Sequence, residues 1–332
     1  TGGTGYIGSH TVVELINAGH TPVIVDNLSN SNIGVLDGIK SITSKSVSFY
    51  QVDVTDIQAL DKVFSENHDI KGIIHFAASK AVGESVKEPL KYYRNNLVGL
   101  MNILECMKKH KVGSLVFSSS CTVYGQPDIL PVTENAPIKP ALSPYGNTKQ
   151  ICEEIIRDTV ASCKGLHAIL LRYFNPIGAH PSALIGELPL GVPQNLIPYV
   201  TQTAAGIREC LTIFGDDYDT PDGSCIRDYI NVTDLAKAHV VSVDRMENGK
   251  QESDVEVFNI GTGRGTSVFE IVNMFEKVTG VKLNYKVGHR REGDIEKVWA
   301  DATIANNTLG WKAEKTMEET IASAWKWQQS LK

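Results

Sequence analysis

Two residues four positions apart, Tyr145 and Lys149, could together remove a proton from a substrate hydroxyl. Positions i and i+4 share one face of a helix, so the ammonium would lie beside the phenol. A free tyrosine has a pKa of about 10, and a nearby cation lowers this pKa toward the range of a useful base. The serine run Ser118–Ser120 could hydrogen-bond the reacting oxygen. Because a lone Y-x-x-x-K is common on helix faces, its meaning depends on the rest of the chain.

A glycine-rich turn, TGGTGYIG, occupies residues 1–8. Its glycines at 2, 5 and 8 permit a tight turn and let a pyrophosphate approach the backbone and the start of the next helix. Asp26 ends an apolar run about 20 residues later, where a carboxylate accepts a hydrogen bond from an adenosine ribose and repels a 2′-phosphate. The pattern predicts NAD rather than NADP. Asp53 ends the following run and could contact adenine, although a solvated strand-end carboxylate explains it nearly as well.

Apolar runs that predict buried strands alternate with helical patterns in the first half of the chain. This order predicts an α/β protein with a doubly wound parallel sheet, the NAD-binding Rossmann fold. We expect residues 1–176 to form this domain, with its first strand ahead of Thr1. Residues 177–332 are expected to form a smaller α/β substrate domain, some segments packing back on the first, and 175–198 reads mainly as loop. The predicted strands are 22–26, 47–54, 72–78, 114–120 and 168–174, and the predicted helices are 8–18, 89–111 and 143–163.

Composition narrows the possible partners and locations. A net charge of −6 over 332 residues argues against a nucleic-acid partner, and no apolar run approaches the roughly 20 residues that span a bilayer. The six cysteines show neither a Cys-x-x-Cys pair nor zinc spacing, so we expect reduced thiols, no bound metal and a cytoplasmic location. The serine run lacks G-x-S-x-G, which excludes a typical serine hydrolase.

The glycine turn followed by Y-x-x-x-K resembles the extended short-chain dehydrogenase/reductase superfamily. Within it, the chain is similar to the UDP-galactose (UDP-glucose) 4-epimerase family over nearly its whole length. Several motifs in the right order are more specific than any one of them. They are TGGTGYIGSH (1–10), KAVGESV (80–86), SSSCTVYG (118–125), YFNPIGAHP (173–181), RDYI (227–230) and RREGD (290–294).

This resemblance implies an NAD-dependent isomerase that interconverts UDP-galactose and UDP-glucose. Tyr145 would take the proton of the sugar 4-hydroxyl, Lys149 would hold the nicotinamide ribose and lower the phenol pKa, and Ser120 would orient the reacting oxygen. The 4-keto sugar would then rotate and be reduced on its other face, so NAD stays bound. Relatives are mostly homodimers, and residues 89–110 and 145–163 are the candidate interface helices.

The resemblance also implies two sets of binding residues. Arg227 and Arg291 match diphosphate-binding arginines, Phe214 matches a residue beside uracil, and Asp294 one near the uridine ribose. The whole substrate set is Ser120, Thr122, Tyr145, Asn175, Asn195, Leu196, Phe214, Arg227, Arg291 and Asp294. The cofactor set is Gly2, Gly5, Tyr6, Ile7, Gly8, Asp26, Asn27, Asp53, Val54, Phe76, Lys80, Asn95, Ser118, Tyr145, Lys149 and Tyr173.

Two alternatives stay open, a nucleotide-sugar 4,6-dehydratase and a non-enzymatic NAD sensor. The dehydratases carry an Asp-Glu pair after the threonine, whereas Val123 and Tyr124 follow Thr122 here. A sensor is expected to lose Tyr145 or Lys149, and both are present. Val298 stands where relatives restricted to unacetylated sugars tend to have a bulky tyrosine, which predicts some activity on UDP-GlcNAc and UDP-GalNAc.

Overall fold

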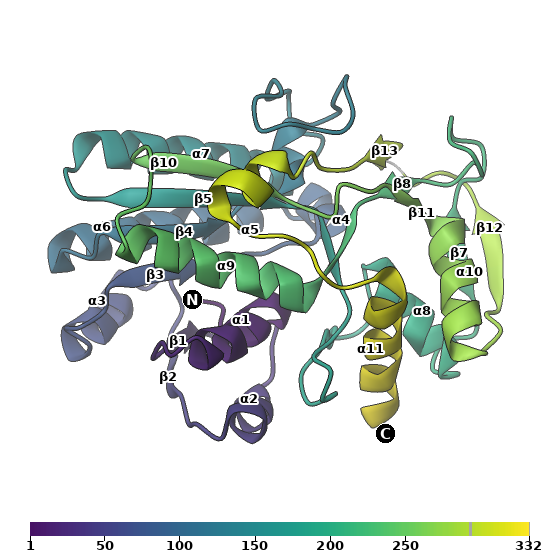
Figure 1. Cartoon of the computed structure of the whole chain (residues 1–332), viewed down its shortest axis with the longest axis horizontal. Helices are drawn as coiled ribbons and strands as arrows, with labels where there is room; N and C mark the ends of the chain where they lie inside the picture. The colour runs from purple at the N-terminus through teal and green to yellow at the C-terminus, as the bar shows by residue number, and fades with distance from the viewer. Residues whose placement is uncertain (292–293, 332) are drawn as a thin grey trace.

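The computed structural model describes residues 1–291 and 294–331 and contains a parallel sheet between two helical layers (Figure 1). The sheet consists of a two-stranded part, β1 and β2, and a four-stranded part that begins with β3. Residues 1 and 2 join the two parts, because Thr1 hydrogen-bonds β3 and Gly2 hydrogen-bonds Val25 of β1. The resulting order is β2-β1-β3-β4-β5-β10, with the glycine turn between β1 and β3. These strands are β1 (Val23–Asp26), β2 (Ser48–Gln51), β3 (Gly72–His75), β4 (Ser114–Ser118), β5 (His167–Tyr173) and β10 (Val255–Ile260).

Helices cover both faces of this sheet because successive strand residues point to opposite sides. Leu115 packs against one helical layer and Val116 against the other. The first layer is α3 (Ile57–Glu66), α6 (Gly99–His110) and α7 (Pro144–Ser162). The second includes α1 (Tyr6–Asn17), α2 (Val35–Thr43), α9 (Val232–Glu247) and the π-turn η3 (Ala305–Leu309).

A smaller group of elements lies beyond the carboxyl ends of the strands (Figure 1). Its main core joins Val200, Ile213, Phe275 and Ile321 from four different elements. Its helices are α8 (Leu196–Ala204), α10 (Val268–Thr279) and α11 (Met317–Ser330). Its strands are β6 (Asn175–Ile177), β7 (Leu211–Phe214), β8 (Ile226–Arg227), β9 (Tyr229–Asn231), β11 (Thr266–Ser267), β12 (Tyr285–Gly288) and β13 (Lys297–Val298).

The parallel α/β fold predicted from the sequence is confirmed, with local corrections. The helix predicted over 89–111 is confirmed as one continuous helical stretch over 89–110, in which α5 (Pro89–Tyr93) passes through the π-helical segment η1 (Arg94–Val98) into α6. It is preceded by α4 (Val82–Lys87). The expected loop 175–198 contains β6 and the start of α8. A short 3-10 turn, η2 (Cys121–Tyr124), follows β4. The domain boundary at residue 176 stays a prediction. Two elements from beyond it join the main sheet and its helices: β10 pairs with β5, and α9 packs against one face of that sheet.

Among residues 1–291 and 294–331, no helix combines the length and apolar character needed to cross a bilayer.

Candidate active site

Helix α7 presents Tyr145 and Lys149 toward the end of β4. The helix starts where Ser143 Oγ accepts a hydrogen bond from Gly146 N at 3.1 Å and Pro144 occupies the first turn, a favoured N-terminal pair. Tyr145 therefore lies in the first turn and Lys149 one turn later. Lys149 Nζ donates to the Ser118 carbonyl at 2.6 Å and lies 5.9 Å from the Tyr145 ring centroid. The structure brings the phenol, the ammonium and the serine run together.

The serine run supplies hydroxyls with different partners. Ser118 Oγ hydrogen-bonds the Tyr173 hydroxyl, and both are buried. Ser120 Oγ accepts from Thr122 N at 3.2 Å and so caps η2. Thr122 Oγ1 is buried and has no hydrogen-bond partner among residues 1–291 and 294–331. A buried hydroxyl in that state costs free energy, which a ligand oxygen placed there offsets.

Burial controls the acidity of this group. It raises the pKa of the Tyr145 phenol well above its usual value, with only partial opposition from the Ser120 hydroxyl. Burial also lowers the pKa of Lys149 to about 8, although the neighbouring Cys152 and Glu153 oppose this. Burial raises this pKa in the polypeptide alone, so the lowering of the phenol pKa, predicted from Lys149 together with a bound nicotinamide ring, stays a prediction.

The glycine turn has the shape that a pyrophosphate needs. A Cβ on Gly8 would lie 2.1 Å from Gly2 O, which explains the glycine there, whereas a Cβ on Gly5 would meet only Gly2 O, at 3.2 Å. Helix α1 has Gly5 as its N-cap and no side-chain cap, so its first amide donors remain available to an anion. These residues fit the NAD predicted from the sequence.

Carboxylates lie beyond the turn, at the ends of β1 and β2. Asp26 Oδ2 accepts from Thr4 N at 3.2 Å and Oδ1 accepts from Leu28 N at 2.9 Å, so its orientation is fixed. Asn27 Nδ2 donates to Asp53 Oδ2 at 2.9 Å. Burial raises the pKa of Asp53, but hydrogen bonds from Thr55 and Asn27 outweigh it and lower the pKa overall. Asp53 therefore stays ionised as an acceptor.

The remaining cofactor candidates surround the same turn. Phe76 N donates to Thr1 O at 3.1 Å, which places Phe76 directly behind Gly2. Tyr6 Oη donates to Gly178 O at 2.6 Å. Asn95 lies in the π-turn and donates to Asn96 Oδ1 at 3.0 Å, and Asn96 in turn binds the backbone of Ser79, next to Lys80. Ile7 and Val54 pack against the two sheet cores.

Three substrate candidates form an exposed cluster on the smaller group of elements. Arg291 binds Asp294 through two hydrogen bonds, at 3.1 and 2.7 Å. Its guanidinium carbon lies 5.6 Å from the Phe214 ring centroid. Phe214 is 44% exposed, far more than a structural aromatic normally is. An aromatic face beside a guanidinium suits a nucleobase and its phosphates.

The other substrate candidates lie on β6, on β8 and at the start of α8. Arg227 on β8 donates to Ile226 O at 2.9 Å, and its charge opposes the burial that raises the pKa of Cys121 to about 12. Arg227 therefore faces the residue after Ser120, whereas Cys121 is no nucleophile. Asn175 N donates to Asp228 O at 3.0 Å, so β6 lies beside β9. Asn195 precedes α8, and Leu196 begins it.

Two glutamates that the sequence analysis did not identify, Glu187 and Glu153, contact predicted site residues or their neighbours. Glu187 accepts from Asn195 Nδ2 at 2.6 Å and lies 3.6 Å from Lys80 Nζ. Glu153, one turn after Lys149, accepts from Ser119 Oγ at 2.6 Å. Two features of the sequence could have singled out Glu153: its i,i+4 spacing from Lys149 and its position among apolar helix residues.

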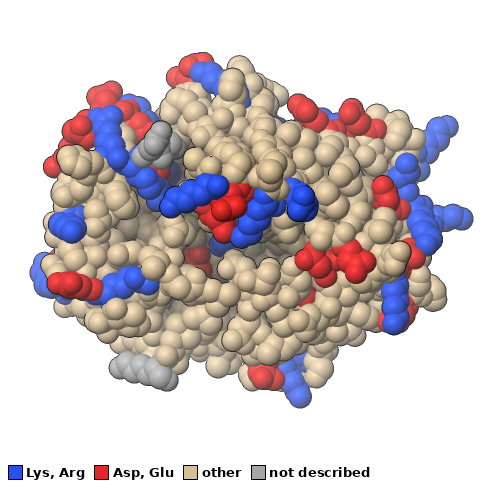
Figure 2. Space-filling view, turned by 180° about the vertical axis from the view of Figure 1, so that it is seen from behind, with Lys and Arg blue, Asp and Glu red and all other residues tan. Residues whose placement is uncertain are grey.

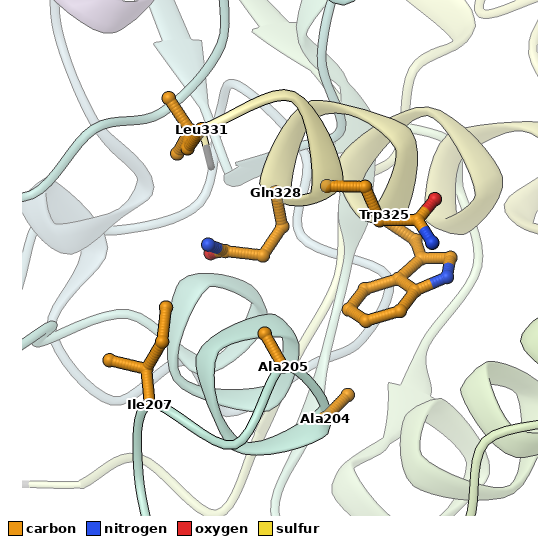
Figure 3. A pocket seen from close by; sticks show the side chains of 7 residues that line it. Ala204, Ala205, Ile207, Trp325, Gln328 and Leu331 are labelled. Carbon is orange, nitrogen blue, oxygen red and sulfur yellow. The ribbon is translucent and has the colours of Figure 1, made fainter.

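The surface shows acidic and basic side chains interspersed around a hollow (Figure 2). A separate cavity of about 470 Å³ lies between the end of α8 and α11 (Figure 3). Its lining includes Ile207, Trp325 and Leu331 but none of the predicted site residues, so it does not belong to this site.

Comparisons with known proteins identify the family. Residues 1–324 match the family model described as GDP-mannose 4,6 dehydratase. The UDP-glucose 4-epimerase of Dictyostelium discoideum is 51% identical over 99% of this chain and 94% of its own length, and that of Bacillus subtilis is 50% identical over 99% and 96%. The chain belongs to the UDP-glucose 4-epimerase family. The family's fold is shared as well, since a crystal structure of the UDP-glucose 4-epimerase from Bifidobacterium longum in complex with NAD⁺ and UDP has a TM-score of 0.95 and 46% identity, covering 99% of this chain and 97% of that one.

The epimerase family, rather than a dehydratase, also suits the residues after Thr122. Val123 is fully buried in an apolar cluster, and the Tyr124 hydroxyl donates to Asn259 Oδ1 at 2.6 Å. A carboxylate pair at these positions could exchange protons with a substrate. Val123 and Tyr124 instead pack in the protein core.

Proposed function

We propose that this protein interconverts UDP-galactose and UDP-glucose, by oxidation at C4 of the sugar followed by reduction on the opposite face. The observation that carries the proposal is the single face formed by Tyr145, Lys149 and Ser118–Ser120. About half of all residues are identical to UDP-glucose 4-epimerases over 99% of the chain, which supports the same chemistry.

Each side chain has a defined task in this scheme. NAD, when bound, would supply the acceptor and then the donor of the C4 hydride. Tyr145 takes the proton of the 4-hydroxyl and later gives it back, while Ser120 hydrogen-bonds the same oxygen. Lys149, fixed by the Ser118 carbonyl, stabilises the negative phenolate by its charge and donates to the cofactor ribose. Arg227 and Arg291 hold the diphosphate while the keto sugar turns about it.

The direct test supplies UDP-galactose to purified protein without added nucleotide. Formation of UDP-glucose supports the proposal, because the protein then carries its own NAD. A free 4-keto-6-deoxy sugar indicates the dehydratase suggested by the description of the matching family model. NAD bound without turnover of either sugar indicates the sensor.

We also propose a side activity on UDP-GlcNAc and UDP-GalNAc. Val298 is buried on β13 in an apolar cluster with Val123 and Tyr124, and it pairs with Arg227 of β8 in the register of the sheet, which supports this proposal. Robust turnover of UDP-galactose with no turnover of UDP-GlcNAc rejects this proposal. Val298→Tyr is expected to reduce the acetamido activity selectively, and Val298→Ala is the matched control.

A homodimer in the cytoplasm completes the proposal. The candidate helices carry exposed apolar side chains, Leu90 at 76% and Met101 at 40%, and Val86 nearby is 62% exposed. Such a patch favours association. Light scattering is expected to give twice the monomer mass, and Leu90→Asp is expected to shift it toward the monomer. All six cysteines are unpaired, as in compartments with reduced thiols.

A further inference from the structure

A buried ion pair lies directly behind the reactive residues. Glu153 on α7 and Arg172 on β5 are 5% and 4% exposed. Arg172 Nε donates to Glu153 Oε1 at 2.9 Å, and one terminal nitrogen donates to Oε2 at 2.6 Å. A bidentate pair of this kind fixes both position and angle.

The pair also holds the end of β4. Ser119 Oγ donates to Glu153 Oε1 at 2.6 Å, and Ser119 is fully buried. Ser119 lies between Ser118, whose carbonyl receives Lys149, and Ser120, which caps η2. One carboxylate therefore joins the helix that carries Tyr145 to the strand end that carries Ser120.

Arg172 extends this link to the next turn. Its second terminal nitrogen donates to the Tyr124 hydroxyl at 3.0 Å, and Tyr124 in turn donates to Asn259 of β10. The η2 turn, which contains Thr122, is thus tied to the same pair. Removing one partner of a buried ion pair is costly, whereas an apolar replacement of both is often neutral, so such pairs are poor devices for stability alone.

Building on the proposed function, we propose that Glu153 is a positioning residue for the reaction: through Ser119 and Arg172 it holds the Ser118–Thr122 segment against α7, so that Ser120 and Tyr145 meet the same substrate oxygen. Reacting groups lose rate steeply when displaced by fractions of an ångström. Because Glu153 touches neither substrate nor cofactor in this scheme, its effect appears in kcat rather than in binding.

Ser119→Ala is the primary test, because it removes one hydrogen bond and leaves the ion pair intact. We expect kcat for UDP-galactose to fall about tenfold, with KM and bound NAD within about twofold of wild type. Ser242→Ala is the matched control: Ser242 is also fully buried and donates to Ala238 O at 2.8 Å, but it lies on α9. We expect wild-type kinetics from it.

Glu153→Gln adds a second readout, the pH dependence of kcat, which would not change if Glu153 had only a structural role. The titratable groups facing Lys149 are Tyr145, Cys152 and Glu153 on α7 and His75 on β3. Without the negative charge of Glu153, the pKa of Lys149 falls further, and the alkaline limb of the kcat profile moves to lower pH. Ser119→Ala keeps that charge and is expected to leave the limb in place. In kcat, the double variant is expected to be no worse than Glu153→Gln alone.

Amide hydrogen exchange provides a readout independent of turnover. Ser119→Ala is expected to speed exchange in 118–125 and to leave α9 unchanged. The positioning role is overturned if Ser119→Ala has both the kcat and the exchange rates of the wild type. It is also overturned if the variant loses activity only in proportion to the NAD that it loses. If the wild type itself makes no UDP-glucose, the proposed function fails, and the exchange comparison still decides the positioning role. If Glu153→Gln does not fold, the kinetics and hydrogen exchange of Ser119→Ala decide the proposal on their own.

Discussion

Two regions of the predicted site are built differently. The reactive group, Tyr145, Lys149, Ser118 and Ser120, is at most 9% exposed, and its residues lie on α7, at the end of β4 and directly after it. The uridine group, Phe214, Arg291 and Asp294, has an aromatic ring 44% exposed and an arginine side chain 53% exposed. The fold fixes the side chains of the predicted reactive group, whereas Arg291 of the predicted uridine group is held mainly by Asp294. Chemistry and recognition should therefore respond differently to mutation.

The largest expected effect comes from Tyr145→Phe, which removes the proposed base and keeps the ring. We expect kcat to fall by about 10³-fold, within the range of general acid–base catalysis, while bound NAD stays at its wild-type level. Stopped assays with UDP-galactose and the absorbance of released NAD measure both. Wild-type turnover in this variant refutes the assignment of the base.

Arg291→Met tests the uridine group. Loss of a charge-assisted contact to the diphosphate is expected to raise KM for UDP-galactose about 10- to 100-fold and to change kcat little. Arg290→Met is the matched control, because Arg290 pairs with Asp217 instead. A large fall in kcat at unchanged KM would place Arg291 in the reactive group and remove the contrast.

Asp26→Asn tests the choice of cofactor. Losing the carboxylate charge is expected to weaken NAD retention by about tenfold and to reduce the discrimination against NADP. Asp56→Asn is the control, because Asp56 caps α3 on the surface. Isothermal titration of the protein stripped of its nucleotide measures both affinities. Unchanged preference for NAD would assign that preference to another residue.

The smallest effect is a pH dependence. Lys149 has a pKa of about 8, so it loses its proton as the pH rises through 8, and the stabilisation of the phenolate is lost with it. We expect kcat to decline above pH 8, and Lys149→Arg, which remains charged, to move this decline to higher pH. A flat profile to pH 10 would contradict a role for the ammonium.

The sequence predicted what local spacing controls. The i,i+4 relation placed Tyr145 and Lys149 on one face, and the apolar run ending at Asp26 placed a carboxylate beside the glycine turn. It could not predict that Glu153 joins Ser119 and Arg172, because these partners lie 34 and 19 residues away. The sequence also could not show how deeply Tyr145 is buried, which raises the pKa of its phenol, because burial depends on tertiary packing.

The most direct test of the central claim uses UDP-galactose deuterated at C4 of the sugar, with purified protein and no added nucleotide. The account predicts UDP-glucose that retains deuterium at C4, because the same hydride is removed and returned. Deuterium at C6 of a 4-keto-6-deoxy sugar, or its loss to the solvent, would contradict the account.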